Sequence, residues 1–329
     1  MRYMLKTRHV LMVLVVVFLT TDAARAQVQR PVPEIDRVLI ISVDGMRPDV
    51  MLRADTPVLR RLMRTGSFTM YAATTDLAVT LPSHTSMLTG VVPTKHGIFY
   101  NGDDVPDDAP HYSLRPTLFE LAKASGYSTA LIAGKSKFDT LARPGTIDVV
   151  VVPPAKDKFS DEKVGKKTVE VIRTHRPEVL VVHLADTDGT GHGIGWGTNE
   201  QIATIEEADR QIGRIMDALD ETDLRSRTLV IISADHGGAG KSHGKDDPRS
   251  RFIPWIASAP AVAQDFDLTR LRELQVRTED TFATACFVLG IALPADIEGQ
   301  PVRAIFPQLE LMRDVPTTGP STQPRRATP

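Results

Sequence analysis

The chain has 329 residues, of which 42% are hydrophobic, and its 39 basic residues nearly balance 41 acidic ones. This length and composition allow one large core or two modest ones. The net charge of −2 excludes a nucleic-acid-binding protein that relies on bulk electrostatic attraction. The single cysteine, Cys286, excludes both an intrachain disulfide and a zinc site built from cysteines. Any bound metal must therefore be held by histidine and carboxylate side chains.

The two ends of the chain do not have the composition of a packed fold. Residues 1–26 combine a basic start, the apolar run Val10–Leu19 and an Ala-Arg-Ala ending, which is typical of a cleaved signal peptide. The apolar run is short for a membrane span, so we expect no stable membrane insertion. The protein is expected to be cleaved after Ala26 and exported to the periplasm or the medium. A retained membrane anchor is the alternative. Residues 313–329 are rich in Pro and Thr, which favours a disordered tail. The catalytic unit is expected over residues 35–307.

The first predicted strand is Arg37–Val43, an almost continuous aliphatic run that ends directly before Asp44. A carboxylate at the end of a buried strand occupies the place where open α/β sheets bind their ligands. The segment Asp55–Pro57 then carries helix-start signals, and the helix that follows is expected to end at Gly66.

A second strand-like segment, Leu77–Leu81, runs into a helix predicted over Pro82–Leu88. The N-terminus of a helix favours an anion because its backbone N–H groups are unpaired and its dipole is positive there. Three hydroxyl groups at this point, from Thr80, Ser83 and Thr85, are candidate nucleophiles. The alternative is that Thr80 or Ser83 only caps the helix.

Beyond this helix, predicted helices and strands alternate along the chain. The helices are Ser113–Gly126, Phe159–His175, Asn199–Glu221 and Thr278–Leu289. The buried strands are Tyr127–Ala133, Ile147–Val152, Val179–Leu184 and Thr228–Ala234. Phe252–Ser258 is interpreted as an edge strand because Pro254 lacks a ladder donor. The alternation predicts an α/β fold with a mostly parallel central sheet and helices on both faces.

Three of the predicted strands end in metal-binding side chain types, and a fourth ends in lysines. The carboxylates and imidazoles are Asp44 after the first strand, Asp188 and His192 after Val179–Leu184, and Asp235, His236 and His243 after Thr228–Ala234. Lys135 and Lys137 follow Tyr127–Ala133 and either grip phosphate oxygens or remain solvated surface charges. Parallel strands present their carboxyl ends at one edge of a sheet, so these side chains are expected to gather there.

Three carboxylates and three imidazoles are more ligands than one four-coordinate ion needs, and they fit two ions. Two divalent cations would be neutralised by the three carboxylates together with an alkoxide from Thr80. A neutral site of this kind accepts an anionic substrate and still stabilises its transition state. The alternative interpretation is a polar, glycine-rich loop whose histidines are satisfied by hydrogen bonds.

Six sequence pieces in this order point to a known family. They are VDGMRPD at Val43–Asp49, TLPSHTSMLTG at Thr80–Gly90, PTKHGI at Pro93–Ile98, DGTGH at Asp188–His192, ADHG at Ala234–Gly237 and KSHG at Lys241–Gly244. Together they resemble the alkaline phosphatase superfamily, and within it the nucleotide pyrophosphatase/phosphodiesterase-like branch of short bacterial members. The resemblance implies an alkaline phosphatase-like three-layer sandwich. It also implies a hydrolase that acts on a small phosphoester substrate.

The resemblance further implies roles for individual residues. One zinc ion would be held by Asp44, Asp235, His236 and the oxygen of Thr80, and the other by Asp188, His192 and His243. Manganese or iron are alternative metals for such ligands. Thr80 would attack phosphorus and form a phospho-threonine that water then hydrolyses. His84 and His96 match motif positions and are expected to shape the loop without binding metal.

Two departures from the family pattern concern the substrate. Ser83 stands where nucleotide-diesterase members carry asparagine, so we expect it near a phosphate oxygen as a shorter substitute. Lys135 and Lys137 resemble basic residues that monoesterase members place near the site, and a dianionic monoester gains more from two ammonium groups than a monoanionic diester does. We expect a diester or related phosphoester, with a monoester as the alternative. No nucleic acid beyond nucleotides is expected as a partner, and no oligomeric state is predicted.

Two other functions compete with this one. Thr80 to His84 has the outline of a sulfatase motif, but threonine cannot be converted to the formylglycine that sulfatases use. An inactive exported binding protein that kept the fold would be expected to have lost a metal ligand, and all the expected ligands are present. A phosphoesterase therefore remains the favoured function.

Overall fold

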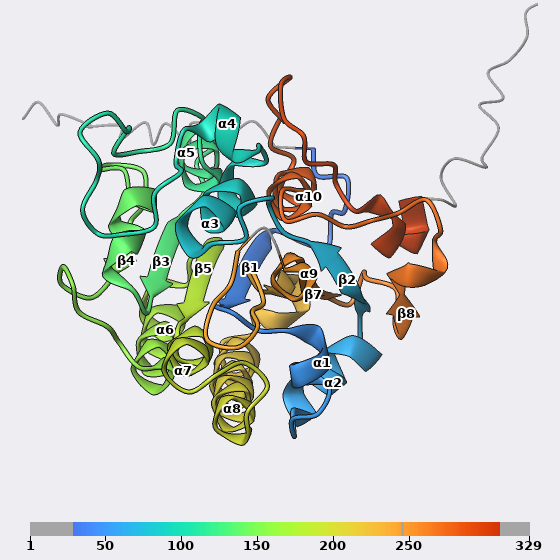
Figure 1. The fold of residues 1–329 in the computed structure, drawn as a ribbon. Coiled ribbons are helices and arrows are strands. Elements are labelled where there is room, and N and C mark those ends of the chain that lie inside the picture. The colour runs from blue at the N-terminus through green and yellow to red at the C-terminus, as the bar shows by residue number, and fades with distance from the viewer. Residues whose placement is uncertain (1–28, 245–246, 310–329) are drawn as a thin grey trace, which may run out of the picture.

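An eight-stranded sheet forms the centre of the molecule in the computed structural model, which describes residues 29–244 and 247–309 (Figure 1). In space the strands follow the order β4-β3-β5-β1-β6-β7-β2-β8. Their bounds are β1 Arg37–Val43, β2 Ser67–Ala73, β3 Thr129–Ala133, β4 Val149–Val151, β5 Val179–Leu184, β6 Thr228–Ser233, β7 Phe252–Ser258 and β8 Phe266–Asp267. The predicted signal peptide and the predicted tail lie outside the described residues, and both stay predictions.

The sheet is mostly parallel, as predicted. Strands β4, β3, β5, β1 and β6 pair in parallel, β7 runs antiparallel to both β6 and β2, and β8 is parallel to β2. Every residue of β3, β5 and β6 is buried, and so is all of β1 after its first residue. Strands that are covered on both faces need apolar side chains on both faces, which explains why these strands are aliphatic runs without polar alternation.

Helices cover both faces of the sheet, so the predicted three-layer α/β sandwich is confirmed (Figure 1). One layer contains α1 Pro48–Met51, α2 Pro57–Arg64, α6 Asp161–His175, α7 Asp186–Gly193 and α8 Asn199–Glu221. The other contains α3 Thr80–Thr89, α4 Pro93–His96, α5 Leu118–Ala124 and α10 Asp280–Leu289. A short helix, α9 Pro248–Arg251, leads into β7. None of the helices in the described ranges has the length and apolar character to cross a bilayer.

The segment before α3 was predicted wrongly. Leu77–Leu81 is not a strand: it contains a turn, Ala78 has a left-handed φ of 48°, and α3 already begins at Thr80. The strand in this region is β2, which the sequence analysis missed. The carbonyl oxygen of Ala78 lies 2.8 Å from Nδ1 of His243. A contact between residues so distant in sequence holds the segment in an irregular conformation, and local propensity carries no sign of it.

The prediction that β7 is an edge strand was also wrong. β7 lies inside the sheet, between β6 and β2. Pro254 is tolerated there because β2 shifts its register between Thr69 and Ala72, and the pairing with β6 ends at Trp255. The missing N–H of Pro254 therefore falls at an irregularity where the ladder requires no donor.

Smaller corrections concern the ends of elements and their burial. The strand predicted as buried over Ile147–Val152 is the short edge strand β4, whose Val150 is 42% exposed. Helix α5 begins at Leu118, five residues later than predicted, because Thr117 and Glu120 form a reciprocal capping box. Helix α6 begins at Asp161, after its cap Ser160.

Helix α7 forms from a glycine-rich stretch that was interpreted only as a strand end. Its first turn is held by Asp161, whose Oδ1 accepts the backbone N–H groups of Ala185 at 2.6 Å and Asp186 at 3.1 Å. In return, Oδ2 of Asp186 accepts the N–H of Asp161 at 2.8 Å. The two helix starts therefore cap each other. As a result Asp188 and His192 lie four residues apart on one helical face.

Candidate metal centre

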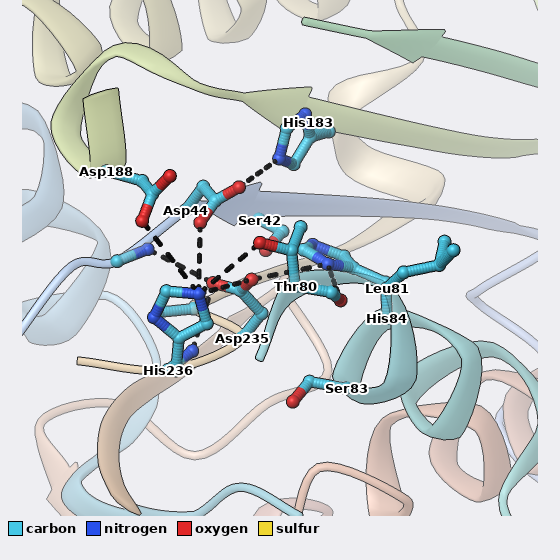
Figure 2. A network of polar contacts seen from close by, with 12 residues as sticks. Ser42, Asp44, Thr80, Leu81, Ser83, His84, His183, Asp188, Asp235 and His236 are labelled. Carbon is cyan, nitrogen blue, oxygen red and sulfur yellow. Dashed lines mark hydrogen bonds and ion pairs between the residues drawn. The ribbon is translucent and has the colours of Figure 1, made fainter. Parts of the chain in front are cut away.

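The candidate site lies at the carboxyl ends of three adjacent strands. β1 pairs with β5 on one side and with β6 on the other, so the residues that follow these strands meet at one edge of the sheet. Asp44 follows β1, Asp188 lies in α7 after β5, and Asp235 and His236 follow β6. Figure 2 shows these side chains and Thr80, from the first position of α3, converging on the ring of His236.

The first half-site consists of Asp44, Thr80, Asp235 and His236. Nε2 of His236 lies 3.4 Å from Asp44 Oδ1, 3.3 Å from Asp235 Oδ2 and 3.4 Å from Thr80 Oγ1. All four residues are buried. The structure therefore brings together the residues that were predicted to hold the first ion.

The second half-site consists of Asp188, His192 and His243. Asp188 Oδ1 lies 3.4 Å from His192 Nε2 and 3.8 Å from His243 Nε2, and the two Nε2 atoms are 3.1 Å apart. The side chain of His192 is 47% exposed, so this half-site opens to solvent. The two half-sites are adjacent, because the ring of His243 stacks on that of His236 with centroids 3.7 Å apart.

Each of the three imidazoles is oriented by a backbone carbonyl. The Nδ1 atom of His236 lies 2.8 Å from the carbonyl oxygen of Gly237. That of His243 lies 2.8 Å from the carbonyl oxygen of Ala78, and that of His192 lies 3.0 Å from the carbonyl oxygen of Lys241. A carbonyl can only accept, so Nδ1 carries the proton and Nε2 presents a lone pair to the site. Histidines that bind metal are commonly held in this way through their second nitrogen.

Three buried carboxylate oxygens at the site have no hydrogen-bond partner within the described part of the chain. They are Asp44 Oδ1, Asp188 Oδ1 and Asp235 Oδ2, and each lies within 4 Å of one of the Nε2 atoms described above. Leaving a buried carboxylate oxygen unpaired costs free energy unless a cation or donor meets it. Ligand atoms of Asp188, His192 and His243 lie within 4.8 Å of one another, and so do those of Asp44, Asp188 and His236. The donor set fits divalent metal ions, while metal ligation itself stays a prediction.

Lys135 lies inside the site and does not project toward solvent as a free charge. Its Nζ is 2.6 Å from Oδ2 of both Asp44 and Asp188, so one ammonium group joins a carboxylate of each half-site. Burial alone would raise the pKa of Asp44, but Lys135 and His183 outweigh this effect and hold that pKa well below its usual value. Burial, aided by the negative charge of Asp44, raises the pKa of Asp235 well above its usual value.

A buried histidine that the sequence analysis missed holds Asp44 through a hydrogen bond. His183, on β5, lies with Nε2 2.8 Å from Asp44 Oδ2, and its Nδ1 accepts the N–H of Gly134 at 3.3 Å. These two bonds fix the tautomer that donates to the carboxylate. No sequence motif marks this histidine, because it lies within a strand and reaches Asp44 only through the pairing of β5 with β1.

The two motif histidines that were expected to shape the loop make hydrogen bonds to neighbouring groups. His84 lies with Nε2 2.8 Å from Ser42 Oγ and with Nδ1 2.8 Å from Thr80 O. His96 lies with Nε2 3.1 Å from Ser86 Oγ. Neither ring belongs to a candidate ligand group of the described residues.

The hydroxyl of Ser83 is buried and bonds to two threonines rather than to a candidate metal ligand. This hydroxyl lies 3.1 Å from the hydroxyls of Thr74 and Thr75, and Figure 2 shows it below Thr80, apart from the dashed contacts around His236. Thr80 and Ser83 lie three residues apart in the first turn of α3 and so share a face of the helix, and Thr74 connects the Ser83 hydroxyl to the carbonyl of Asp235. Ser83 is not among the residues that line the cavity beside Thr80, and its predicted contact with phosphate stays a prediction.

A cavity of about 240 Å³ opens beside Thr80 and the second half-site. Asn101 lines it and was missed by the sequence analysis. The side-chain oxygen of Asn101 accepts the N–H of Leu81 at 2.9 Å and an N–H of the Lys137 ammonium at 3.0 Å. The outer wall of the cavity includes Lys156 and Lys158. Among the described residues, the imidazoles of the second half-site are the only aromatic rings that line it.

The family model described as type I phosphodiesterase / nucleotide pyrophosphatase matches residues 38–249. An uncharacterized pyrophosphatase/phosphodiesterase of Schizosaccharomyces pombe is 23% identical over 222 residues, which are 63% of this chain and 46% of that protein. Human ectonucleotide pyrophosphatase/phosphodiesterase family member 1 is 25% identical over 215 residues, which are 60% of this chain and 23% of that protein. The chain thus spans less than half the length of these two curated relatives.

Solved structures with the same fold include phosphodiesterases and sulfatases. Murine ectonucleotide pyrophosphatase/phosphodiesterase 5, as an inactive variant in complex with AMP, superposes with a TM-score of 0.67 at 15% identity, over 82% of this chain and 100% of that one. A 2-O glycosaminoglycan sulfatase superposes with a TM-score of 0.65 at 17% identity, over 83% of this chain and 74% of that one. At these identities the likeness extends to the fold alone.

Proposed function

Because the chain belongs to the type I phosphodiesterase / nucleotide pyrophosphatase family of the alkaline phosphatase superfamily, we propose that it hydrolyses phosphodiester or related phosphoester bonds, with Thr80 as the nucleophile. The observation that carries this proposal is the position of Thr80. Its hydroxyl oxygen lies 3.4 Å from His236 Nε2, within the ligand cluster, and Thr80 also lines the cavity. Of the two hydroxyl residues that line the cavity, Thr80 and Ser136, Thr80 is the one that also lies in the ligand cluster.

The ligand cluster supports a metal-assisted reaction. The first ion would be held by Asp44, Thr80, Asp235 and His236, and the second by Asp188, His192 and His243. We propose zinc, with manganese or iron as alternatives for the same nitrogen and oxygen ligands. Bound metals would supply Lewis-acid stabilisation of negative charge on the attacking and leaving oxygens.

Two properties of the chain itself support a phospho-threonine intermediate. Burial lowers the pKa of His236 to about 4, so its imidazole is neutral at neutral pH and keeps the Nε2 lone pair, 3.4 Å from the Thr80 oxygen, available to bind a metal ion beside that oxygen. Thr80 is the first residue of α3, where the helix dipole favours developing negative charge. Attack of this oxygen on phosphorus forms the phospho-threonine and releases the alcohol. Water then cleaves the new ester and restores the hydroxyl.

Asn101 is proposed to bind a phosphoryl oxygen, the role that the sequence predicted for Ser83. Its side-chain oxygen already accepts two hydrogen bonds, from Leu81 and Lys137, which leaves the amide NH₂ group as its remaining donor toward the cavity it lines. Neutral donors at such positions stabilise charge that develops on oxygen in the transition state.

A second candidate activity, hydrolysis of phosphate monoesters, is favoured by the lysines of the cavity. The ammonium group of Lys137 is held by the neutral oxygens of Asn101, at 2.9 and 3.0 Å, so no carboxylate of the described residues cancels its charge through a direct contact. Lys156 and Lys158 also line the cavity, together with the carboxylates of Asp103 and Asp157. A dianionic monoester gains more from the ammonium groups than a diester. Lys135, by contrast, pairs with Asp44 and Asp188 and is proposed to stabilise the ligand carboxylates.

The test is a comparison of kcat/KM for bis-p-nitrophenyl phosphate, a nitrophenyl nucleotide diester and p-nitrophenyl phosphate, with zinc supplied. Thr80→Ala is expected to lower diester hydrolysis by about 10⁴-fold, as loss of a nucleophile does elsewhere. Thr85→Ala is the matched control, because Thr85 lies on the same helix and donates only to the carbonyl of Leu81. Activity that survives in Thr80→Ala would overturn the mechanism. A monoester preference that falls in Lys137→Ala would establish the second candidate.

Export is proposed separately from the activity. Its support is the composition of residues 1–26, which are typical of a cleaved signal peptide. Expression of the full chain in a bacterial host, followed by N-terminal sequencing of periplasmic material, is expected to find a start at Gln27. Full-length protein retained in the cytoplasm would contradict export.

A further inference from the structure

Trp196 lies where the segments that carry both half-sites meet. The indole is buried, with 7% of the residue exposed, and its Nε1–H donates to the carbonyl of Gly45 at 3.0 Å. Gly45 directly follows Asp44 of the first half-site. The backbone N–H of Trp196 donates to Gly240 O at 2.8 Å, in the loop that leads to His243. One residue is thus bonded to the loop after β1 and to the loop after β6.

Glycines from three ligand-bearing segments give the indole its space. A Cβ atom added to Gly191 would lie 2.6 Å from the ring, one added to Gly238 would lie 2.4 Å from it, and one added to Gly45 would lie 3.4 Å from it. The first two distances are shorter than any ordinary contact. Gly191 precedes His192, and Gly238 lies two residues after His236. In the structure these glycines admit the indole of Trp196.

The indole also contacts the imidazoles of the second half-site. Its ring meets that of His192 edge to face, with centroids 5.1 Å apart and an angle of 85°, and it meets that of His243 at 5.8 Å and 66°. Edge-to-face contacts fix the tilt of a ring as well as its distance. Trp196 therefore limits the orientations that both histidines can take.

We propose that Trp196 is a positioning residue that holds the second half-site in place against the first. Asp188 and His192 come from a helix and His243 from a loop, so the strand register that places the first half-site does not fix them. Trp196 provides the missing connection, through its hydrogen bond beside Asp44 and its contacts with His192 and His243. The inference rests on the proposed metal centre and is independent of which ester is hydrolysed.

The chain contains a matched control for this residue. It has two tryptophans, and the second, Trp255, is fully buried in β7, where its Nε1–H donates to Thr281 Oγ1 at 3.1 Å. Replacing Trp255 removes an indole of equal size and a comparable hydrogen bond away from the ligands. The Trp255→Phe variant also leaves Trp196 as the single tryptophan, so its fluorescence reports directly on the second half-site.

The experiment measures the two zinc affinities by chelator competition and the bound zinc by elemental analysis. In Trp196→Leu, the zinc affinity of the second half-site is expected to fall about 10- to 100-fold, as metal affinity does when other residues that hold metal ligands in place are removed. The zinc affinity of the first half-site is expected to stay unchanged. Trp196→Phe, which keeps a ring but loses the N–H, is expected to show a smaller loss of the same affinity. Trp255→Phe is expected to keep both affinities, and its fluorescence is expected to change on addition of zinc.

Three results would overturn the proposal. One is an equal loss of both affinities, which would indicate general destabilisation. The second is unchanged zinc binding in both Trp196 variants. The third is a fluorescence signal from Trp255→Phe that does not respond to zinc, and it does not depend on whether a Trp196 variant folds. Failure of the proposed function is a separate result, because Thr80→Ala lowers ester hydrolysis while Trp196 and its fluorescence response stay in place.

Discussion

The two half-sites use the same types of side chain but are built in different ways. In the first, Asp44 directly follows the central strand β1, Asp235 lies two residues after the end of β6, and with His236 they are completely buried. In register, Ser42 pairs with Ser233, so the two carboxylates emerge side by side from paired strands. The pairing of β1 with β6 brings these carboxylates together, so formation of the sheet also sets their positions.

The second half-site depends on side-chain contacts outside the sheet. Asp188 and His192 lie on α7, whose first turn is held by Asp161, and His243 lies on a loop that is tied to Ala78 and Trp196. It is also the more exposed of the two. Under the proposed function, the rigid, buried half-site would hold Thr80, and the open one would meet substrate and water.

The largest expected contrast comes from removing one histidine of each half-site. Without metal, His236→Ala is expected to lower the free energy of unfolding by about 3 kcal/mol, because it opens a buried cavity beside Asp44 and Asp235. His192→Ala is expected to change it by less than about 0.5 kcal/mol, because the side chain is largely exposed. Each variant should lose one bound ion. Urea denaturation in a chelator, with elemental analysis of the metal-loaded protein, measures both effects, and equal destabilisation would contradict the comparison.

An effect that depends on pH is expected from Asp161, which supports the second half-site through α7. Burial, with the nearby charge of Asp186, raises the pKa of Asp161 from 3.8 to about 8. Between these values the folded protein binds a proton that the unfolded chain has released. Stability is therefore expected to be full below the lower value and to fall as pH rises toward the upper one, by at most about 1.4 kcal/mol per pH unit.

Asp161→Asn is expected to remove this slope. The amide oxygen can still accept the N–H groups of Ala185 and Asp186, and the side chain carries no charge that burial would penalise. The variant should therefore match the wild type near pH 4 and exceed it in stability near pH 8. Denaturation curves at several pH values measure the difference, with Glu162→Gln, an exposed neighbour on α6, as the control. A slope that persists in Asp161→Asn would assign it to another group.

The smallest expected effect concerns Lys158, on the outer wall of the cavity. Lys158→Ala is expected to raise KM for an anionic ester by about two- to fivefold at low salt and to leave kcat unchanged, because exposed charges act weakly and are screened. The difference should shrink as salt is added. Lys166→Ala, on the surface of α6, is the control. A lowered kcat would place Lys158 in the reaction itself.

The sequence determined the parts of the molecule that depend on local composition. Strands that are buried on both faces must be apolar throughout, so β1, β5 and β6 were recognisable, and so were the ligand-type residues at their ends. Alternation of strands with helices was enough to predict a mostly parallel sheet between two helical layers. The order of the six motifs along the chain was enough to indicate the family.

Tertiary structure decided what depends on contacts between residues far apart in the chain. From the sequence, Lys135 could have contacted phosphate, but in the structure its ammonium group lies between Asp44 and Asp188. His183, Asn101 and Trp196 carried no motif signal, and each gained its role from a neighbour more than a dozen residues away. The same reason explains why β7 was misplaced at an edge. Local propensity records the preferences of a segment alone, whereas these positions are set by which segments pack together.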